Sequence, residues 1–168
     1  MELYNHHTLE HLNTKVIQEF SKTLEMFGLS QGDARLFVTL YIHPTPMTLD
    51  EMSEALGKSK TSMSTGVRNL ADQGLVERVW KKGFRKDLYQ ADENLYRKFM
   101  NSYTNKWLTA SHEQMATLKS IDIQMEDDSN NTEQPCEVAQ LKKRVDDMIR
   151  FHRLISEAFK EIQPNNSK

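Results

Sequence analysis

The sequence has few of the residues that interrupt regular structure or cross-link a chain. Its 168 residues include six glycines and four prolines, too few for the many turns of a β-sandwich or barrel, so long helices are favoured. One cysteine, Cys136, excludes an intramolecular disulfide and fits a reducing compartment. Apolar runs such as 36–42 are too short to span a bilayer. The first residues lack the pattern of a secretory signal, so we expect a cytoplasmic protein without a membrane segment.

Basic residues are concentrated in one stretch, although the whole chain has a formal charge of −2. Residues 58–86 contain eight Lys or Arg against two acidic residues, which gives that stretch +6 and the remainder −8. A basic module on an acidic body directs a polyanion to one face. This distribution indicates a polyanion as a partner, which the helix-turn-helix described next identifies as double-stranded operator DNA.

Two short helices in the middle of the chain predict a helix-turn-helix. Thr48 and Glu51 form a Thr-x-x-Glu capping box before a short helix over 49–56. Ser59 is placed to cap a second helix over 60–73, in which Gly66 beside the apolar residues permits close approach to a neighbouring helix.

A basic hairpin follows the second helix. Residues 76–80 and 87–91 are strand-like, and residues 81–86 form a basic tip between them, which is typical of a wing. We expect Trp80 to pack the wing against the body of the protein. The predicted fold is therefore mainly α, a winged helix-turn-helix with a two-stranded β-wing and long dimerisation helices at both ends.

Long helices surround this module. Apolar residues at three- and four-residue spacing predict a first helix that Gly28 ends, Ser30 is a plausible cap for the second, and Asp92 is placed to cap the longest. The last helix is apolar on two faces, which favours burial between two subunits, hence a homodimer. The expected segments are an N-terminal dimerisation helix over 1–28, the DNA-binding domain over 29–92, a linker and dimerisation helix over 93–125, an acidic loop over 126–136, and a C-terminal dimerisation helix with its tail over 137–168.

The second helix of the helix-turn-helix has the side chains that a major groove accepts. Opposite its apolar side it carries short hydrogen-bonding groups and one arginine, which suit base edges and phosphates. The hairpin tip adds cations without acidic partners within the turn, which could reach a minor groove or its phosphates. The predicted DNA contacts are Ser59, Lys60, Thr61, Ser62, Ser64, Thr65, Arg68, Asn69, Lys81, Lys82, Arg85 and Lys86.

Three sequence blocks within this region resemble one family. Residues 47–60 (Met-Thr-Leu-Asp-Glu-Met-Ser-Glu-Ala-Leu-Gly-Lys-Ser-Lys), 64–70 and 83–92 (Gly-Phe-Arg-Lys-Asp-Leu-Tyr-Gln-Ala-Asp) are similar to the GbsR group of MarR-like repressors, regulators of glycine betaine biosynthesis. The resemblance covers roughly 14–125. It implies a homodimeric repressor of genes for choline import or glycine betaine synthesis, which choline releases from DNA.

A candidate site for such a small quaternary ammonium effector lies on the helix after the wing. Aromatic faces bind quaternary ammonium ions, and several aromatic residues fall within about a third of the helix circumference, with one more at the end of the second helix of the chain. The predicted ligand-binding residues are Tyr41, Tyr96, Phe99, Tyr103 and Trp107. An aromatic stripe at helical spacing is also typical of plain core packing, and both interpretations stay open.

Other functions have weaker signals. No catalytic motif or cofactor-binding loop is present, so we expect no enzyme. His7 and His11 are four residues apart but are better read as surface histidines than as metal ligands. An oxidant-sensing repressor would use Cys136, but Glu133 and Glu137 disfavour its thiolate. A repressor of another effector, or a winged helix used only for protein contacts, remains an alternative.

Overall fold

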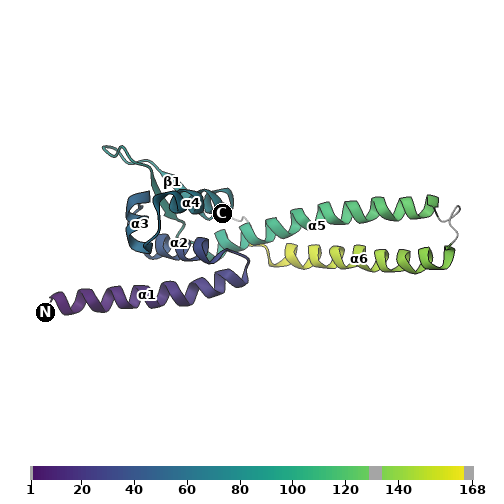
Figure 1. Ribbon diagram of the computed structural model, residues 1–168, viewed down its shortest axis with the longest axis horizontal. Coiled ribbons are helices and arrows are strands. Elements are labelled where there is room, and N and C mark those ends of the chain that lie inside the picture. Colours follow the sequence, from purple (N-terminus) through teal and green to yellow (C-terminus); the bar gives the residue numbers. More distant parts are fainter. Residues whose placement is uncertain (1, 129–133, 165–168) are drawn as a thin grey trace. The chain divides into compact units, whose positions relative to one another are not determined.

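The structure, a computed structural model, describes residues 2–128 and 134–164, and the side chains of 8–127 and 134–164. It confirms the predicted mainly α fold with a two-stranded wing (Figure 1). The elements are α1 (Glu2–Met26), α2 (Gln31–Ile42), α3 (Leu49–Leu56), α4 (Lys60–Asp72), β1 (Val76–Val79), β2 (Leu88–Ala91), α5 (Leu95–Asp128) and α6 (Pro135–Ile162). They form two compact units, one up to Phe99 and one from Met100 onward.

Local hydrogen bonds define the helix starts in the first unit as predicted. The Thr48 hydroxyl accepts from the Glu51 backbone N–H at 3.3 Å, and the Glu51 carboxylate accepts from the Thr48 N–H at 2.7 Å, which completes the capping box. Ser30 and Ser59 cap α2 and α4 through their hydroxyls. Gly57 ends α3 with φ of 61°, a left-handed conformation that favours glycine.

The core of the first unit lies among α1, α2, α3, α4 and the base of the wing. Gly66 of α4 lies against Leu36 of α2, which confirms the expected close approach of the two helices. The buried apolar side chains are Leu24, Ala34, Leu36, Phe37, Val38, Leu40, Met47, Met52, Met63, Val67, Leu70, Leu75, Val76 and Phe99.

The wing is a short antiparallel hairpin. Strand pairing runs from Val76 opposite Ala91 to Val79 opposite Leu88. It is one residue shorter on each strand than predicted. At the base of the hairpin, the Met47 N–H donates to the Tyr89 carbonyl at 2.8 Å and the Tyr89 N–H donates back at 2.9 Å. The residue just before the capping box is therefore bound directly to β2.

Trp80 does not pack against the body, so that prediction is wrong. It follows the last paired residue of β1, and 82% of its surface is exposed. Among the described residues, no further strand lies beside the hairpin against which a large ring could be buried.

Two predicted boundaries of α5 and α6 also need correction. Asn94, not Asp92, caps α5, because the Asn94 side chain accepts from the Arg97 N–H at 3.1 Å. The acidic loop is shorter than the predicted 126–136, since α5 continues to Asp128 and α6 begins at Pro135. Proline suits the first helical turn because its missing N–H would have no partner there. Residues 129–133 of the loop, which include Glu133, lie outside the described residues.

The second unit pairs the rest of α5 with α6 (Figure 1). Val145 and Ile149 are buried, and the Ser111 hydroxyl lies 3.0 Å from that of Ser156 and 3.1 Å from His152 Nδ1. Trp107 stacks on Phe159 with ring centroids 5.4 Å apart. In neither unit does any helix of the described residues have the length and apolarity needed to cross a membrane.

Candidate nucleic-acid interface

Helix α4 separates an apolar side from a polar one. Met63, Gly66, Val67 and Leu70 are buried in the first unit, as the 3.6-residue period requires. The predicted α4 contacts are exposed, apart from half-buried Ser64: Ser59, Lys60, Thr61, Ser62, Thr65, Arg68 and Asn69. The structure therefore presents the short polar side chains and Arg68 to solvent.

Some of these polar groups also bind within the protein. The Ser59 hydroxyl accepts from the Ser62 N–H at 3.2 Å and donates to the Ser62 hydroxyl at 3.0 Å, so Ser59 stabilises the start of α4. The Asn69 amide donates to the Asp33 carboxylate of α2 at 3.4 Å. Thr61, Thr65 and Arg68 are consequently the better placed of these residues for a new hydrogen bond.

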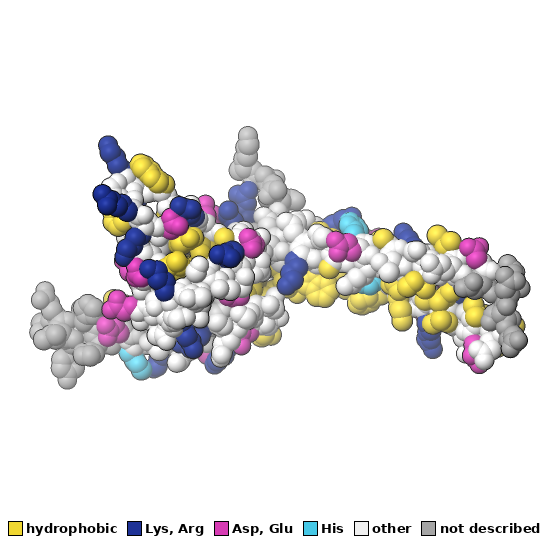
Figure 2. Space-filling view, turned by 45° about the horizontal axis from the view of Figure 1, so that its top comes forward, with side chains coloured by type: hydrophobic (Ala, Val, Ile, Leu, Met, Phe, Trp, Pro, Cys, Tyr) yellow, Lys and Arg dark blue, Asp and Glu magenta, His cyan; other side chains and the backbone are white. Residues whose placement is uncertain are grey.

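The wing supplies an exposed group of cations. Dark blue Lys and Arg side chains gather over the hairpin in Figure 2, with hydrophobic side chains among them. Lys81, Lys82, Arg85 and Lys86 are all exposed, and Lys81 Nζ lies 5.0 Å from the centre of the Phe84 ring. This arrangement gives the hairpin a positive surface on which an aromatic ring is also accessible.

Two of the wing cations have acidic partners that lie outside the tip at residues 81–86. Arg78 lies 2.5 Å from Asp87 across the hairpin, and Lys86 lies 2.7 Å from Asp50 of α3. Asp87 lies between the tip and β2, and Asp50 comes from a distant part of the sequence. Neither ion pair could be predicted from the charge composition alone.

Asp50 joins the wing to α4. Its two carboxylate oxygens lie 2.8 Å from Lys60 Nζ and 2.7 Å from Lys86 Nζ. Hydrogen bonds from Lys60, then from Lys86, lower the pKa of Asp50 to about 2, and the same contact raises the pKa of Lys86. The first residue of α4 and the wing thus lie on one face of the unit. Sequence reasoning missed Asp50, because 36 residues separate it from Lys86.

Two aromatic side chains of the wing were also not predicted as site residues. Trp80 directly precedes the basic tip and Phe84 lies within it, and 82% and 52% of their surfaces are exposed. Large exposed rings among cations are the side chains that stack on bases or enter a minor groove. Their position next to the basic residues of the tip is the signal that could have identified them.

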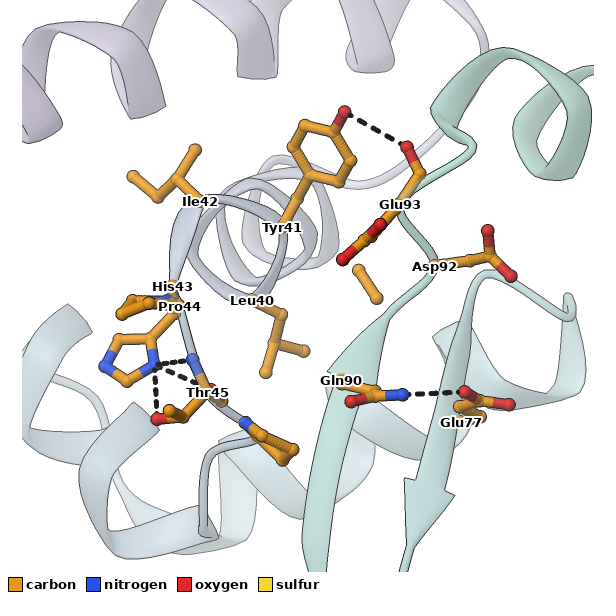
Figure 3. Close-up of a pocket in the computed structure, with 12 residues that line it drawn as sticks. Leu40, Tyr41, Ile42, His43, Pro44, Thr45, Glu77, Gln90, Asp92 and Glu93 are labelled. Atoms are coloured by element: carbon orange, nitrogen blue, oxygen red, sulfur yellow. Dashed lines mark hydrogen bonds between the residues drawn. The ribbon is translucent and has the colours of Figure 1, made fainter.

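A cavity of about 590 Å³ lies at the opposite end of the hairpin, between the end of α2 and the start of α5 (Figure 3). Tyr41 donates a hydrogen bond to the Glu93 carbonyl at 3.4 Å, and Gln90 donates to the Glu77 carboxylate at 2.8 Å. Asp92 also lines the cavity and lies 3.4 Å from Lys98. The lining residues are Leu40, Tyr41, Ile42, His43, Pro44, Thr45, Pro46, Glu77, Gln90, Ala91, Asp92 and Glu93. Three carboxylates and no Lys or Arg stand among these twelve.

The predicted ligand-binding aromatics have different surroundings. In the first unit, Tyr41 stacks on Phe37 beside the cavity, Phe99 is only 7% exposed, and 65% of Tyr96 is exposed. In the second unit, Tyr103 and Trp107 pack with Phe159 of α6, at centroid distances of 5.8 and 5.4 Å. Tyr41 and the Tyr103–Trp107 pair therefore belong to two different aromatic groups.

The structure also describes the candidates for metal and redox chemistry. Over residues 8–127 and 134–164, no three His, Cys, Asp or Glu side chains lie close enough together to hold a metal ion. The side chain of His7 lies outside the described residues. Cys136 is a free, exposed thiol in the first turn of α6.

Comparison with known proteins identifies the class. Residues 24–97 match the family described as sugar-specific transcriptional regulator TrmB. A crystal structure of a transcriptional regulator has the same fold, with a TM-score of 0.60 at 19% identity, over 89% of this chain and 96% of that one. The chain therefore has a winged helix-turn-helix fold, as the sequence predicted, and its residues 24–97 are similar to transcriptional regulators.

The sequence relatives narrow this class. The transcriptional repressor OpcR of Bacillus subtilis is 32% identical over 119 residues, which are 71% of this chain and 64% of OpcR. The repressor GbsR of the same organism is 33% identical over 120 residues, 67% of this chain and 66% of GbsR. The chain thus matches less than two thirds of the length of either relative. These matches confirm the GbsR-type resemblance, and both relatives are regulators rather than enzymes.

Proposed function

We propose that this chain is a cytoplasmic, homodimeric repressor that binds operator DNA through α4 and the wing, and that choline or a similar quaternary ammonium ion weakens this binding. The observation that carries the DNA-binding part is the carboxylate of Asp50, which lies within 2.8 Å of both Lys60 and Lys86. These two contacts bring Lys60, the first residue of α4, close to Lys86 of the wing, which supports a single DNA-binding surface. Such a surface can enter a major groove while the hairpin follows the adjacent backbone.

The contact residues are assigned different roles by their chemistry. Arg68, on the exposed side of α4, suits a bidentate contact to guanine. Lys81, Lys82 and Arg85, on the wing, suit phosphates or the minor groove. If each protomer neutralises about four phosphates, the logarithm of affinity of a dimer should change with the logarithm of salt concentration with a slope of roughly −7.

Two variants test this surface by fluorescence anisotropy on a duplex that the wild-type protein selects from a random pool. Arg68→Ala should weaken operator binding by ~1–3 kcal/mol and relax specificity, and Arg85→Ala should reduce the salt slope by about 1 per contact. Lys119→Ala on α5, outside the helix-turn-helix, is the control and should leave both quantities unchanged. Unchanged binding in the double variant Arg68→Glu, Arg85→Glu would refute the surface and favour a winged helix for protein contacts.

Dimerisation is supported by apolar side chains that the helices leave exposed. On α1, Leu9, Leu12 and Val16 recur at helical spacing and are exposed. Helix α6 also has exposed large apolar residues, namely Leu141, Met148, Phe151 and Leu154. Exposed apolar rows of this length mark protein contacts, and a two-fold dimer would suit a near-palindromic operator. Light scattering of Phe151→Glu should then give a monomer, whereas an unchanged wild-type dimer mass would exclude this face of α6.

The effector part rests on the cavity beside Tyr41. An aromatic ring close to several carboxylates provides the two interactions that a quaternary ammonium ion uses, and about 590 Å³ is ample for such an ion. A neutral sugar, which the name of the matched family suggests, could donate hydrogen bonds to the three carboxylates but would gain no attraction between opposite charges. The ligand must fit the non-binding arrangement better than the DNA-bound one, because only differential affinity shifts the equilibrium.

The effector is tested by adding choline to the protein–operator complex, with its neutral isostere 3,3-dimethyl-1-butanol and glucose as comparisons. Choline alone should release DNA, and a hundredfold loss of affinity corresponds to about 2.7 kcal/mol of coupling. Loss of the choline response in Tyr41→Ala would assign choline binding to the cavity. Loss of the response in Trp107→Ala would assign it to the Tyr103–Trp107 pair on α5. Release by glucose, or by none of the three, would remove the choline proposal and leave the repressor proposal in place.

A further inference from the structure

We propose that Asp50 is a positioning residue that sets DNA specificity, because it holds two DNA-contacting lysines at a fixed separation. The inference rests on the DNA-binding surface proposed above. The inference gives an acidic residue a role in DNA recognition, although the negative charge of that residue would by itself repel phosphate.

The geometry is that of a bridge. Oδ1 of Asp50 lies 2.8 Å from Lys60 Nζ and Oδ2 lies 2.7 Å from Lys86 Nζ, so each oxygen binds a different lysine. The three residues come from three elements, the first turn of α3, the first residue of α4 and the hairpin. A single carboxylate therefore relates the reading helix to the wing.

Stability does not account for this arrangement. The Asp50 side chain is 43% exposed and the two lysine side chains are 59% and 66% exposed. Exposed ion pairs contribute little to folding stability, because water and salt screen them. The helix start that Asp50 occupies is already capped by Thr48 and Glu51.

The bridge restricts groups that would otherwise move. Lys86 lies beyond the last strand pair, Val79 with Leu88, so strand pairing does not fix its position. Lysine ammonium groups stand on flexible four-carbon chains and bind phosphate as point charges without preferred geometry. Asp50 aligns the two ammonium groups, which helps only where the backbone of the DNA places its phosphates to match.

The same carboxylate opposes phosphate at every sequence. A cavity of about 220 Å³ lies between α4 and the wing, and Asp50, Arg85 and Asp87 line it with both lysines. The negative charge lowers the affinity for arbitrary DNA, while the alignment raises the affinity for a matched site. A repulsive element of this kind widens the difference between correct and incorrect partners.

The test compares Asp50→Asn with the wild-type protein on two duplexes, the operator selected in vitro and a scrambled duplex of equal length. Asparagine keeps the shape but removes the charge. Affinity for the scrambled duplex should rise about threefold, and its salt slope should steepen by about 0.9 for each added phosphate contact. Affinity for the operator should fall about threefold, so the specificity ratio drops roughly tenfold.

Asp72→Asn is the matched control, since it removes the same charge from the exposed end of α4. It should change the affinities for both duplexes by one common factor. Asp50→Glu should restore part of the specificity. In a Lys86→Gln background, Asp50→Asn should no longer lower the affinity for the operator, although it should still raise the affinity for the scrambled duplex. Thermal unfolding confirms that each variant is folded.

If Asp50→Asn changed the affinities for the two duplexes by the same factor, as the control is expected to do, this inference would be overturned and the proposed function would stand. Failure of the wild-type protein to bind any duplex would overturn the proposed function and this inference together. A threefold loss of operator affinity on adding Asp50→Asn in the Lys86→Gln background would also overturn the bridge, because the alignment would then not need that lysine.

Discussion

Gly66 of α4 lies against Leu36 of α2 so closely that a Cβ atom on Gly66 would be 2.8 Å from Leu36 Cδ2. Leu36 is only 1% exposed and has little room to move. The absence of a side chain at this position therefore sets the separation of the reading helix from the helix behind it.

Gly66→Ala is expected to destabilise the protein by about 1 kcal/mol. Overpacking costs ~1–3 kcal/mol, and the better helix propensity of alanine returns up to about 1 kcal/mol. Urea unfolding measures the difference. Gly32→Ala is the control, because a Cβ there meets no atom within 4 Å and should stabilise α2 slightly. Equal gains in both variants would show that the close approach carries no strain.

Acid should weaken the contribution of Asp50 to stability. Its folded-state pKa is about 2, below the ordinary value of 3.8, so the small stabilisation from these exposed ion pairs is present above about pH 4 and is lost as the pH falls toward 2. The unfolding free energies of wild type and Asp50→Asn should converge over this window. A difference that instead changes between pH 5 and 8 would assign the effect to another group.

DNA should change the fluorescence of Trp80. The chain has two tryptophans, so Trp107→Phe leaves Trp80 as the sole reporter on the exposed wing. Operator DNA should quench this emission, because a base that stacks on the exposed ring deactivates its excited state. Trp80→Phe, which retains Trp107, measures how much of the fluorescence change of the wild-type protein comes from Trp107. An unaltered Trp80 spectrum on a saturated complex would place the wing away from DNA.

Oxidation of Cys136 should not release the operator. The thiol is exposed at the start of α6, in the second unit, and no residue of the proposed DNA surface belongs to that unit. Hydrogen peroxide should leave the dissociation constant of wild type and Cys136→Ser the same. A loss of affinity in wild type that is absent from Cys136→Ser would favour the redox-sensing alternative.

Features of the fold that depend on neighbours in sequence could be predicted from the sequence. The Thr48–Glu51 capping box, the caps Ser30 and Ser59, and the two faces of α4 all arise within one or two helical turns, where spacing fixes geometry. The α5 cap was misplaced by two residues because Asp92 and Asn94 are both good capping residues. The hydrogen bond from Arg97 distinguishes them.

Features that depend on tertiary contacts could not be predicted. The bridge from Asp50 to Lys86 joins residues 36 positions apart, and the cavity joins Tyr41 to Glu93, 52 positions away. Trp80 was assigned to packing because large rings are usually buried, whereas the short strand pairing leaves it in solvent. Site residues of this kind become visible only once the hairpin is placed beside α3 and α4.

The reciprocal hydrogen bonds between Met47 and Tyr89 attach β2 of the wing to the segment that precedes α3. The stem of the hairpin is bound to the residue that leads directly into the helix-turn-helix, so tilting the wing would break backbone hydrogen bonds in the interior of the unit. The paired strands of the wing and the start of α3 should therefore move together, whereas residues 80–87 lie outside this constraint. In the proposed repressor, a signal that tilts the paired strands would have to shift the start of α3 with them.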